Sequence, residues 1–152
     1  MIKEIICFTD GSGGALGAAG LAIKLAEFYQ AGLNAFYIID SGWGSLLGDE
    51  RINTSETRMR FFRWFEGELK DEAAKSLKAV EEMAREIGVP IKIQILIGPT
   101  EKVILNQAGE KPGALVVLPN PAATAPAAAG GLRYNAGSLI KKLNGPVLIG
   151  PK

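Results

Sequence analysis

The sequence predicts an α/β fold with one open sheet of five parallel strands and helices on both faces of that sheet. Short apolar runs rich in Ile, Val, Leu and Phe alternate with longer segments whose apolar residues recur every three or four positions. These segments alternate as strand and helix along the whole chain and end on a fifth strand. Connections between parallel strands are right-handed, so the helices of such a chain cover both faces of the sheet.

The expected strands are the five apolar runs at residues 2–9, 34–40, 91–97, 114–118 and 146–150. The first run is rich in Ile, Phe and Cys, and the fourth is apolar throughout, as expected of buried strands. Because the carboxyl ends of parallel strands lie at one edge of the sheet, a ligand is expected beside Asp10, Asp40, Gly98 and Pro119, which follow or end four of the runs.

The expected helices span about residues 14–30, 54–87, 100–108 and 139–144. The long second helix carries a continuous apolar stripe at helical spacing. We expect Asn53 to cap its first turn, with Glu56 three residues later, and Gly88 followed by Pro90 to end it. Residues 41–53 are expected to form an irregular loop, because glycines and polar residues interrupt any regular period.

The composition excludes several classes of protein. A formal net charge of +1 gives no concentrated basic face for nucleic acid. The chain has no His and a single Cys, so neither an internal disulfide nor a multi-thiolate metal site is expected. Cys7 lies inside the first apolar run and is expected to be buried and unreactive. With no signal peptide and no membrane span recognisable, we expect one cytoplasmic domain over residues 1–152.

A glycine-rich stretch, "CFTDGSGGALGAAG" at residues 7–20, has three interpretations. The spacing G-x-G-x-x-x-G with Asp40 after the second strand is similar to a dinucleotide site, but its third glycine is one residue late and Asp10 would face the pyrophosphate. An ATP-pyrophosphatase loop would need Asp and Ser where Leu16 and Gly17 stand. Close packing of the first helix on the sheet explains most of the glycines but not Asp10.

Arginines and aromatic residues mix in "TRMRFFRWFEGELKDE" at residues 57–72, as they do in proteins that bind single-stranded nucleic acid. At helical spacing Phe62 and Phe65 face the core while the arginines face solvent, so we expect no nucleic-acid partner. Phe61 and Trp64 fall outside the apolar stripe and are free to cover a partner or the preceding loop. No spacing identifies a base for a serine nucleophile, and no catalytic residue is assigned.

Five segments together resemble the universal stress protein family: "DGS" after the first strand, the long second helix, "GVPIKIQILIG" (88–98), "ALVVLPN" (114–120) and "GSLIKKLNGPVLI" (137–149). The resemblance covers the chain apart from residues 41–60. It implies a Rossmann-like, adenine-nucleotide α-hydrolase-like fold with strand order 3-2-1-4-5. It also implies a homodimer, and membership of either the ATP-binding or the non-binding group of that family.

The resemblance also implies how a nucleotide would be held. In binding members, the Asp at the end of the first strand contacts the ribose and the adenine edge, and it matches Asp10, which Thr9 precedes. A main-chain group near the end of the second strand meets the adenine and matches Ile38. Asp40 ends that same strand.

The phosphate loop is where this chain departs from the family pattern, Gly-x2-Gly-x9-Gly-(Ser/Thr) after the fourth strand. Its first glycine position falls near Pro119, and its third falls beside Gly131. The pair Gly137-Ser138 comes several residues late, and Ser138 either caps the last helix or contacts phosphate. Arg133 is either an exposed side chain without a partner or a charged substitute for the missing backbone donors.

The expected function is a regulatory module of the universal stress type that binds an adenine nucleotide, AMP in preference to ATP, with no metal identified. A slow nucleotide hydrolase using the same cleft, and a structural member that binds no nucleotide, are the alternatives. The expected homodimer forms through residues 146–150, a short apolar edge strand. The candidate binding residues are Thr9, Asp10, Ile38, Asp40, Pro119, Asn120, Gly131, Arg133, Gly137 and Ser138.

Overall fold

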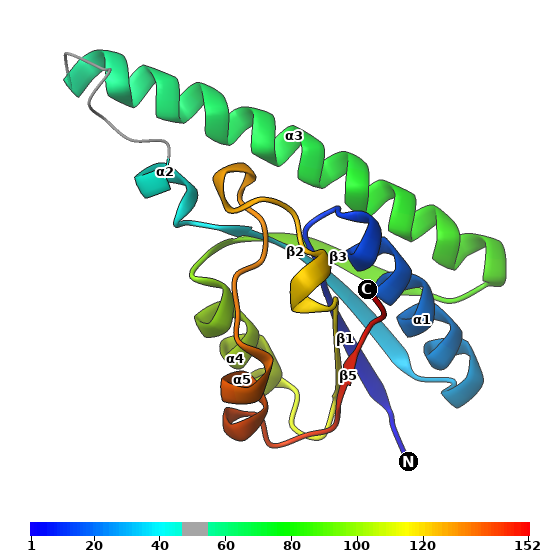
Figure 1. Cartoon of the computed structure of the whole chain (residues 1–152). Coiled ribbons are helices and arrows are strands. Elements are labelled where there is room, and N and C mark those ends of the chain that lie inside the picture. The colour runs from blue at the N-terminus through cyan, green and yellow to red at the C-terminus, as the bar shows by residue number, and fades with distance from the viewer. Residues whose placement is uncertain (47–54) are drawn as a thin grey trace.

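The computed structural model describes residues 1–46 and 55–152, whose strands form one parallel sheet in the order β3-β2-β1-β4-β5 (Figure 1). The strands are β1 (Glu4–Thr9), β2 (Gly32–Asp40), β3 (Ile91–Gly98), β4 (Leu115–Leu118) and β5 (Val147–Ile149). The predicted fold class and strand order are confirmed. Each predicted strand lies within two residues of the observed one at either end.

The helices are α1 (Gly13–Tyr29), α2 (Trp43–Leu46), α3 (Ser55–Ile87), α4 (Thr100–Glu110) and α5 (Ala136–Lys142), with two 3₁₀ turns, η1 (Pro121–Ala123) and η2 (Ala127–Ala129). The prediction that the segment after β2 has no regular structure is wrong for α2. Trp43 anchors this helix, because its ring packs against Phe62 and Phe65 of α3 with centroids 5.6 and 5.1 Å away. The predicted cap Asn53, and the rest of that loop, lie outside the described residues.

The central strands β1, β2 and β4 are buried on both faces. α1 and α3 cover one face, where they pack on Ile5 and Cys7 of β1, while α4 and α5 cover the other, where they pack on Ile6 and Phe8 (Figure 1). Successive residues of a strand point to opposite faces, so an uninterrupted apolar run is what a strand between two helical layers requires.

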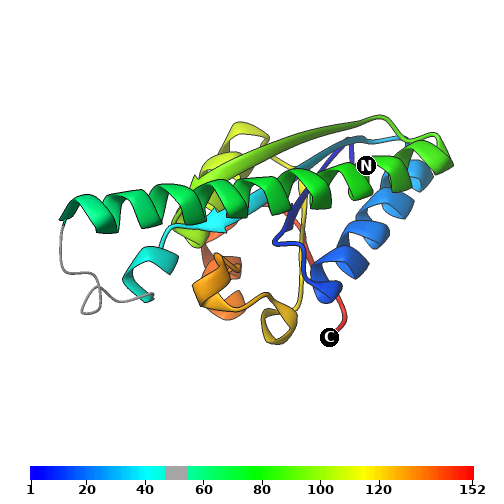
Figure 2. The same cartoon turned by 90° about the horizontal axis from the view of Figure 1, so that it is seen from above.

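Helix α3 is longer than the sheet that it covers. Its 33 residues span about 50 Å, whereas the eight residues of β3 span about 26 Å. Its N-terminal part therefore projects past the strands together with α2 (Figure 2). Although α3 is long, no helix of the described residues is apolar enough to cross a membrane.

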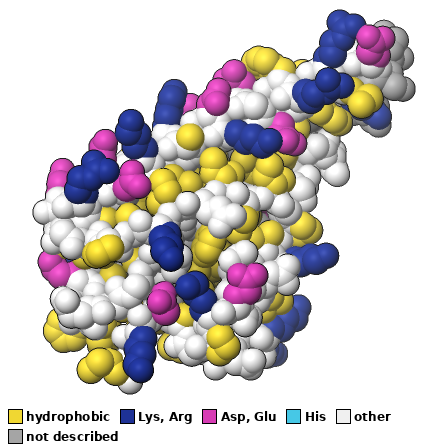
Figure 3. Space-filling model, turned by 180° about the vertical axis from the view of Figure 1, so that it is seen from behind, with side chains coloured by type: hydrophobic (Ala, Val, Ile, Leu, Met, Phe, Trp, Pro, Cys, Tyr) yellow, Lys and Arg dark blue, Asp and Glu magenta, His cyan; other side chains and the backbone are white. Residues whose placement is uncertain are grey.

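Charges of both signs alternate over the face that Figure 3 shows, where α3 runs along the top. Ion pairs within α3 account for part of this pattern: Arg60–Glu56 at 2.6 Å, Lys70–Glu66 at 3.1 Å, Lys75–Glu72 at 3.7 Å and Arg85–Glu81 at 3.5 Å. Positive charge is not gathered into a basic surface on this face.

The thiol of Cys7 is buried in β1, as the sequence predicts, and burial raises its pKa to about 12. Because the thiolate is the reactive form, we expect no reaction of the native protein with Ellman's reagent and one reactive thiol per chain once denaturant is added. A Phe28→Cys variant, with the new thiol at an exposed position, is the positive control and should react in the native state. Rapid labelling of the native wild-type chain would contradict this prediction.

Candidate functional site

The carboxylate of Asp10 lies at the carboxyl end of β1, where it holds the chain that follows β4. Its Oδ2 accepts hydrogen bonds from the main-chain N–H groups of Ala125 (2.7 Å) and Leu132 (3.1 Å). Its Oδ1 accepts one from the main-chain N–H of Ser12 (3.1 Å). The side chain is 4% exposed. The carboxylate for which the family resemblance implies a ribose contact therefore binds three N–H groups of its own chain in this conformation.

The segment between β4 and α5, residues 119–135, passes over the carboxyl end of β1 and reaches the carboxyl end of β2. The main-chain N–H of Asp40 donates to the carbonyl of Gly130 (2.9 Å), which has a φ of 74°. A Cβ on Gly131 would lie 2.0 Å from the carbonyl oxygen of Ala125. Only glycine fits there, so the folding of this segment explains Gly131 without a ligand.

The carboxylate of Asp40 joins β2 to the start of α4. Its Oδ2 accepts hydrogen bonds from the main-chain N–H (3.0 Å) and the Oγ1 (2.5 Å) of Thr100, and its Oδ1 accepts one from the N–H of Gly42 (2.8 Å). Thr100 is the first residue of α4, and Pro99 before it has no side chain that can cap the helix. Asp40 thus satisfies a helix-terminal N–H group from a neighbouring strand.

Arg133 is attached to this network through its backbone. Its main-chain N–H donates to Oγ1 of Thr100 (3.0 Å), while its side chain is exposed. The guanidinium lies over the turn after β2, where a Cβ on Gly42 would be 3.6 Å from its Nη1. No acidic side chain among residues 1–46 and 55–152 forms an ion pair with it.

Two open hollows meet at Arg133 and Glu101, which line both, and together they are called the Arg133 depression. One, of about 340 Å³, is also lined by Asp40, Ser41, Gly42, Pro99 and Thr100. The other, of about 510 Å³, is also lined by Pro121, Thr124, Ala125, Ala127, Leu132, Tyr134 and Asn135. The depression lies at the carboxyl end of β2, on the side of the sheet where parallel α/β proteins hold ligands.

Two tyrosines stabilise the carboxyl ends of β1 and β4, because their neutral hydroxyls donate hydrogen bonds to main-chain carbonyls there. The hydroxyl of Tyr37 donates to the carbonyl of Asp10 (2.9 Å), and that of Tyr134 donates to the carbonyl of Pro119. Burial raises the pKa of Tyr37 to about 12, with smaller contributions from the negative charges of Asp10 and Glu72. Burial, together with the charge of Asp10, also raises the pKa of Tyr134. Both hydroxyls therefore keep their protons at neutral pH.

Of the ten predicted site residues, Asp40 and Arg133 line the depression. Oγ1 of Thr9 accepts a hydrogen bond from the N–H of Gly11 (3.2 Å), inside the turn after β1. The side chain of Ile38 is fully buried between the sheet and α4. Pro119 is buried too, and its carbonyl accepts a hydrogen bond from the hydroxyl of Tyr134.

The remaining predicted residues belong to local turns and caps. Oδ1 of Asn120 accepts from the N–H of Ala122 (2.9 Å) and caps η1. Gly137 and Ser138 lie in the first turn of α5, outside the depression. The alternative that Ser138 caps this helix is wrong: Asn135 is the cap, because its Oδ1 accepts from the N–H of Ser138 (2.9 Å).

The glycines at residues 11–17 are required for different structural reasons, and two of them for none that packing explains. Gly11 has a φ of 79°, and a Cβ on Gly14 would lie 2.5 Å from Cβ of Ala123 in η1. A Cβ on Gly13 or Gly17 would meet nothing within 4 Å, so close packing explains neither. The expected close packing of α1 comes from its buried alanines: Ala15, Ala18, Ala19, Ala22 and Ala26. Gly17 lacks the tight helix–strand packing that the third glycine of a dinucleotide fingerprint provides.

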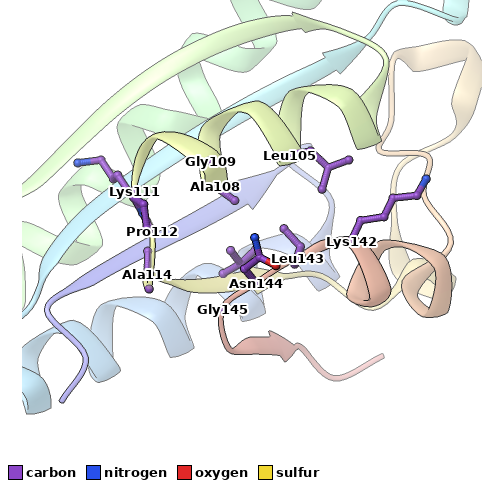
Figure 4. Close-up of a pocket in the computed structure, with 12 residues that line it drawn as sticks. Leu105, Ala108, Gly109, Lys111, Pro112, Ala114, Lys142, Leu143, Asn144 and Gly145 are labelled. Carbon is purple, nitrogen blue, oxygen red and sulfur yellow. The ribbon is translucent and has the colours of Figure 1, made fainter.

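The sequence patterns did not indicate Thr100 and Glu101 as site residues. The signal was present in "GPTE" at 98–101, where a hydroxyl residue and an acid open a helix directly after a strand end. A further hollow, of about 140 Å³, lies between the ends of α4 and α5 and includes Lys111 and Lys142 (Figure 4). None of the predicted site residues lines it.

Comparison with known proteins shows which proteins the chain is similar to. No family model matches the chain. It is 31% identical over 118 residues to universal stress protein MJ0531 of Methanocaldococcus jannaschii, a match that covers 78% of this chain and 64% of that protein. Its fold is similar to that of universal stress protein UspA from Lactobacillus plantarum (TM-score 0.68, 20% identity, 98% of this chain and 97% of that one).

It is also similar to the structure of a universal stress protein in complex with cAMP (TM-score 0.65, 18% identity, 97% of this chain and 95% of that one). These structures establish the fold, and the match to the Methanocaldococcus protein extends the likeness to the sequence. The segments that carry the resemblance include β1 with its Asp10, the strand β3 and the end of β4. The chain therefore has the fold of the universal stress proteins, and its sequence is similar to one of them over 64% of that protein's length.

Proposed function

We propose that this protein is a regulatory module that binds an adenine nucleotide in the Arg133 depression, with AMP preferred over ATP. The observation that carries the proposal is an exposed guanidinium without an ion-pair partner among the described residues, held at the carboxyl end of a parallel strand. A guanidinium pairs with phosphate through two parallel hydrogen bonds. That one structure of similar fold contains cAMP supports the adenine nucleotide as the ligand class.

The preference for one phosphate follows from the backbone of residues 119–135. A triphosphate needs several free N–H groups that approach it closely, as glycine-rich loops provide. Here the N–H groups of Ala125 and Leu132 already donate to Asp10, and Gly131 is packed against the carbonyl of Ala125. The carboxylates of Asp40 and Glu101 also line the depression, so they would repel additional phosphate charge.

Titration calorimetry with AMP, ADP and ATP tests this function. We expect heat of binding with AMP and progressively weaker binding of ADP and ATP. The control is an Arg85→Ala variant, because Arg85 lies on α3 away from the depression and its loss should leave the affinity unchanged. No binding of any of the three at millimolar concentration would refute the function, and tightest binding of ATP would refute the preference.

We further propose a homodimer that forms through β5. This strand is at one edge of the sheet, and its three residues, Val147, Leu148 and Ile149, are only partly buried. An exposed apolar edge favours pairing with another strand, and twofold symmetry satisfies such an edge without building fibres. The alternative is a monomer whose edge Pro146 and Pro151 protect, since proline donates no hydrogen bond to a neighbouring strand.

Light scattering after size exclusion distinguishes these states, because the chain has a mass of 16.1 kDa. We expect a dimer that Leu148→Asp converts to a monomer, as a buried unpaired carboxylate would oppose the interface. Ile93→Asp is the matched control on the opposite edge strand β3, where the side chain is also partly exposed, and it should remain a dimer. A wild-type monomer at tens of micromolar protein would refute the dimer.

A further inference from the structure

We propose that Glu101 and Arg133 recognise the ligand at two points: Arg133 pairs with its phosphate and Glu101 accepts hydrogen bonds from its sugar hydroxyls. This inference rests on the proposed function and deepens it. It assigns ribose recognition to Glu101 instead of Asp10, and it defines the ligand class as a sugar monophosphate with free vicinal hydroxyls, such as a nucleoside 5′-monophosphate.

The choice of Glu101 follows from the hydrogen bonds that the nearby carboxylates already make. Asp10 accepts three from main-chain N–H groups, and Asp40 accepts three from Gly42 and Thr100. Oε1 of Glu101, in contrast, is shielded from solvent and has no hydrogen-bond partner in the part of the chain that the structure describes. A buried acceptor without a donor costs free energy, which a ligand hydroxyl would recover.

The two side chains are held on a common support. Glu101 follows Thr100 in the first turn of α4, and the backbone of Arg133 donates to Oγ1 of Thr100. Asp40 in turn accepts two hydrogen bonds from Thr100, so a strand, a helix and the segment after η2 fix one another. Binding groups that project from such a network lose little freedom on binding.

Glu101 and Arg133 do not neutralise each other. Both line the two hollows of the depression, yet they form no ion pair with each other. Glu101 is partly exposed and has three side-chain torsions, so its carboxylate can turn toward a ligand while the backbone stays in place. The guanidinium of Arg133 is then available to the phosphate of the ligand, and the carboxylate of Glu101 is available to its hydroxyl groups.

The experiment combines two substitutions with four ligands in calorimetric titrations: AMP, 2′,3′-dideoxy-AMP, adenosine and ribose 5-phosphate. Glu101→Ala should weaken AMP about tenfold and leave dideoxy-AMP unchanged, because only AMP carries the hydroxyls. Arg133→Ala should weaken AMP and dideoxy-AMP about equally, by tenfold or more, and leave adenosine unchanged. Glu110→Ala, at the exposed far end of α4, is the matched control and should change nothing.

The outcomes separate this inference from the proposed function. If the wild-type protein binds AMP and neither substitution alters the affinity, the inference and the placement of the nucleotide in the Arg133 depression are both wrong, while adenine-nucleotide binding elsewhere on the chain stands. If AMP does not bind but ribose 5-phosphate binds and both variants lose it, two-point recognition is supported and the adenine function is refuted. Absence of binding of both compounds to the wild-type protein overturns both. Melting temperatures verify folding, and Glu101→Leu, which also removes both acceptor oxygens, replaces Glu101→Ala should the latter unfold.

Discussion

Replacing Asp10 by alanine is expected to lower the free energy of unfolding by about 3 kcal/mol, a large fraction of the stability of a domain of this size. The substitution leaves three main-chain N–H groups without their acceptor, and that of Leu132 is buried. It also removes the hydrogen bonds by which the carboxylate of Asp10 holds residues 119–135 at the end of β1. Urea denaturation followed by circular dichroism measures the change.

Two further variants show whether the hydrogen bonds are the cause. Asp10→Asn keeps one acceptor oxygen and should lose less stability than Asp10→Ala. Asp71→Ala removes an exposed carboxylate from α3 and should change the free energy of unfolding by no more than about 0.5 kcal/mol. A loss below about 1 kcal/mol for Asp10→Ala would mean that the carboxylate does not hold this segment in solution. Asp10 would then be available to a ligand's ribose, as the family resemblance implies.

Replacing Phe8 by alanine is expected to cost about 4 kcal/mol, the effect of opening a large cavity in a packed core. Phe8 lies in β1, the middle strand of the sheet, and is 0% exposed. Its ring stacks on Phe36 of β2 with centroids 5.7 Å apart, on the face covered by α4 and α5. The free energy of unfolding from urea titration measures the loss.

The matched control for this cavity is Phe28→Ala, which removes the same side chain from a position that is 79% exposed. We expect it to change stability by no more than about 0.5 kcal/mol, because little apolar surface is buried there. Equal losses for Phe8→Ala and Phe28→Ala would contradict the assignment of the core. An intermediate loss is expected for Phe8→Leu, which fills part of the cavity.

The sequence by itself determined the five strands, the helices between them and the edge of the sheet at which a ligand is expected. These features depend on local periods and on turn residues, both of which can be read from neighbours in the chain. The position of Asp10 and Asp40 at one edge followed as well, because the carboxyl ends of parallel strands lie together. The strand order 3-2-1-4-5 came from the family resemblance, and the observed sheet confirms it.

Only the tertiary structure decided what those carboxylates bind. Asp10 accepts hydrogen bonds from residues 115 and 122 positions away, and Asp40 from one 60 positions away. The tertiary structure also decided that α2 forms, because Trp43 packs against Phe62 and Phe65 of α3. It likewise decided that Glu101 and Arg133 line the same depression. No local period specifies such pairs, because a carboxylate near a strand end can accept from any N–H group that the folded chain brings within about 3 Å.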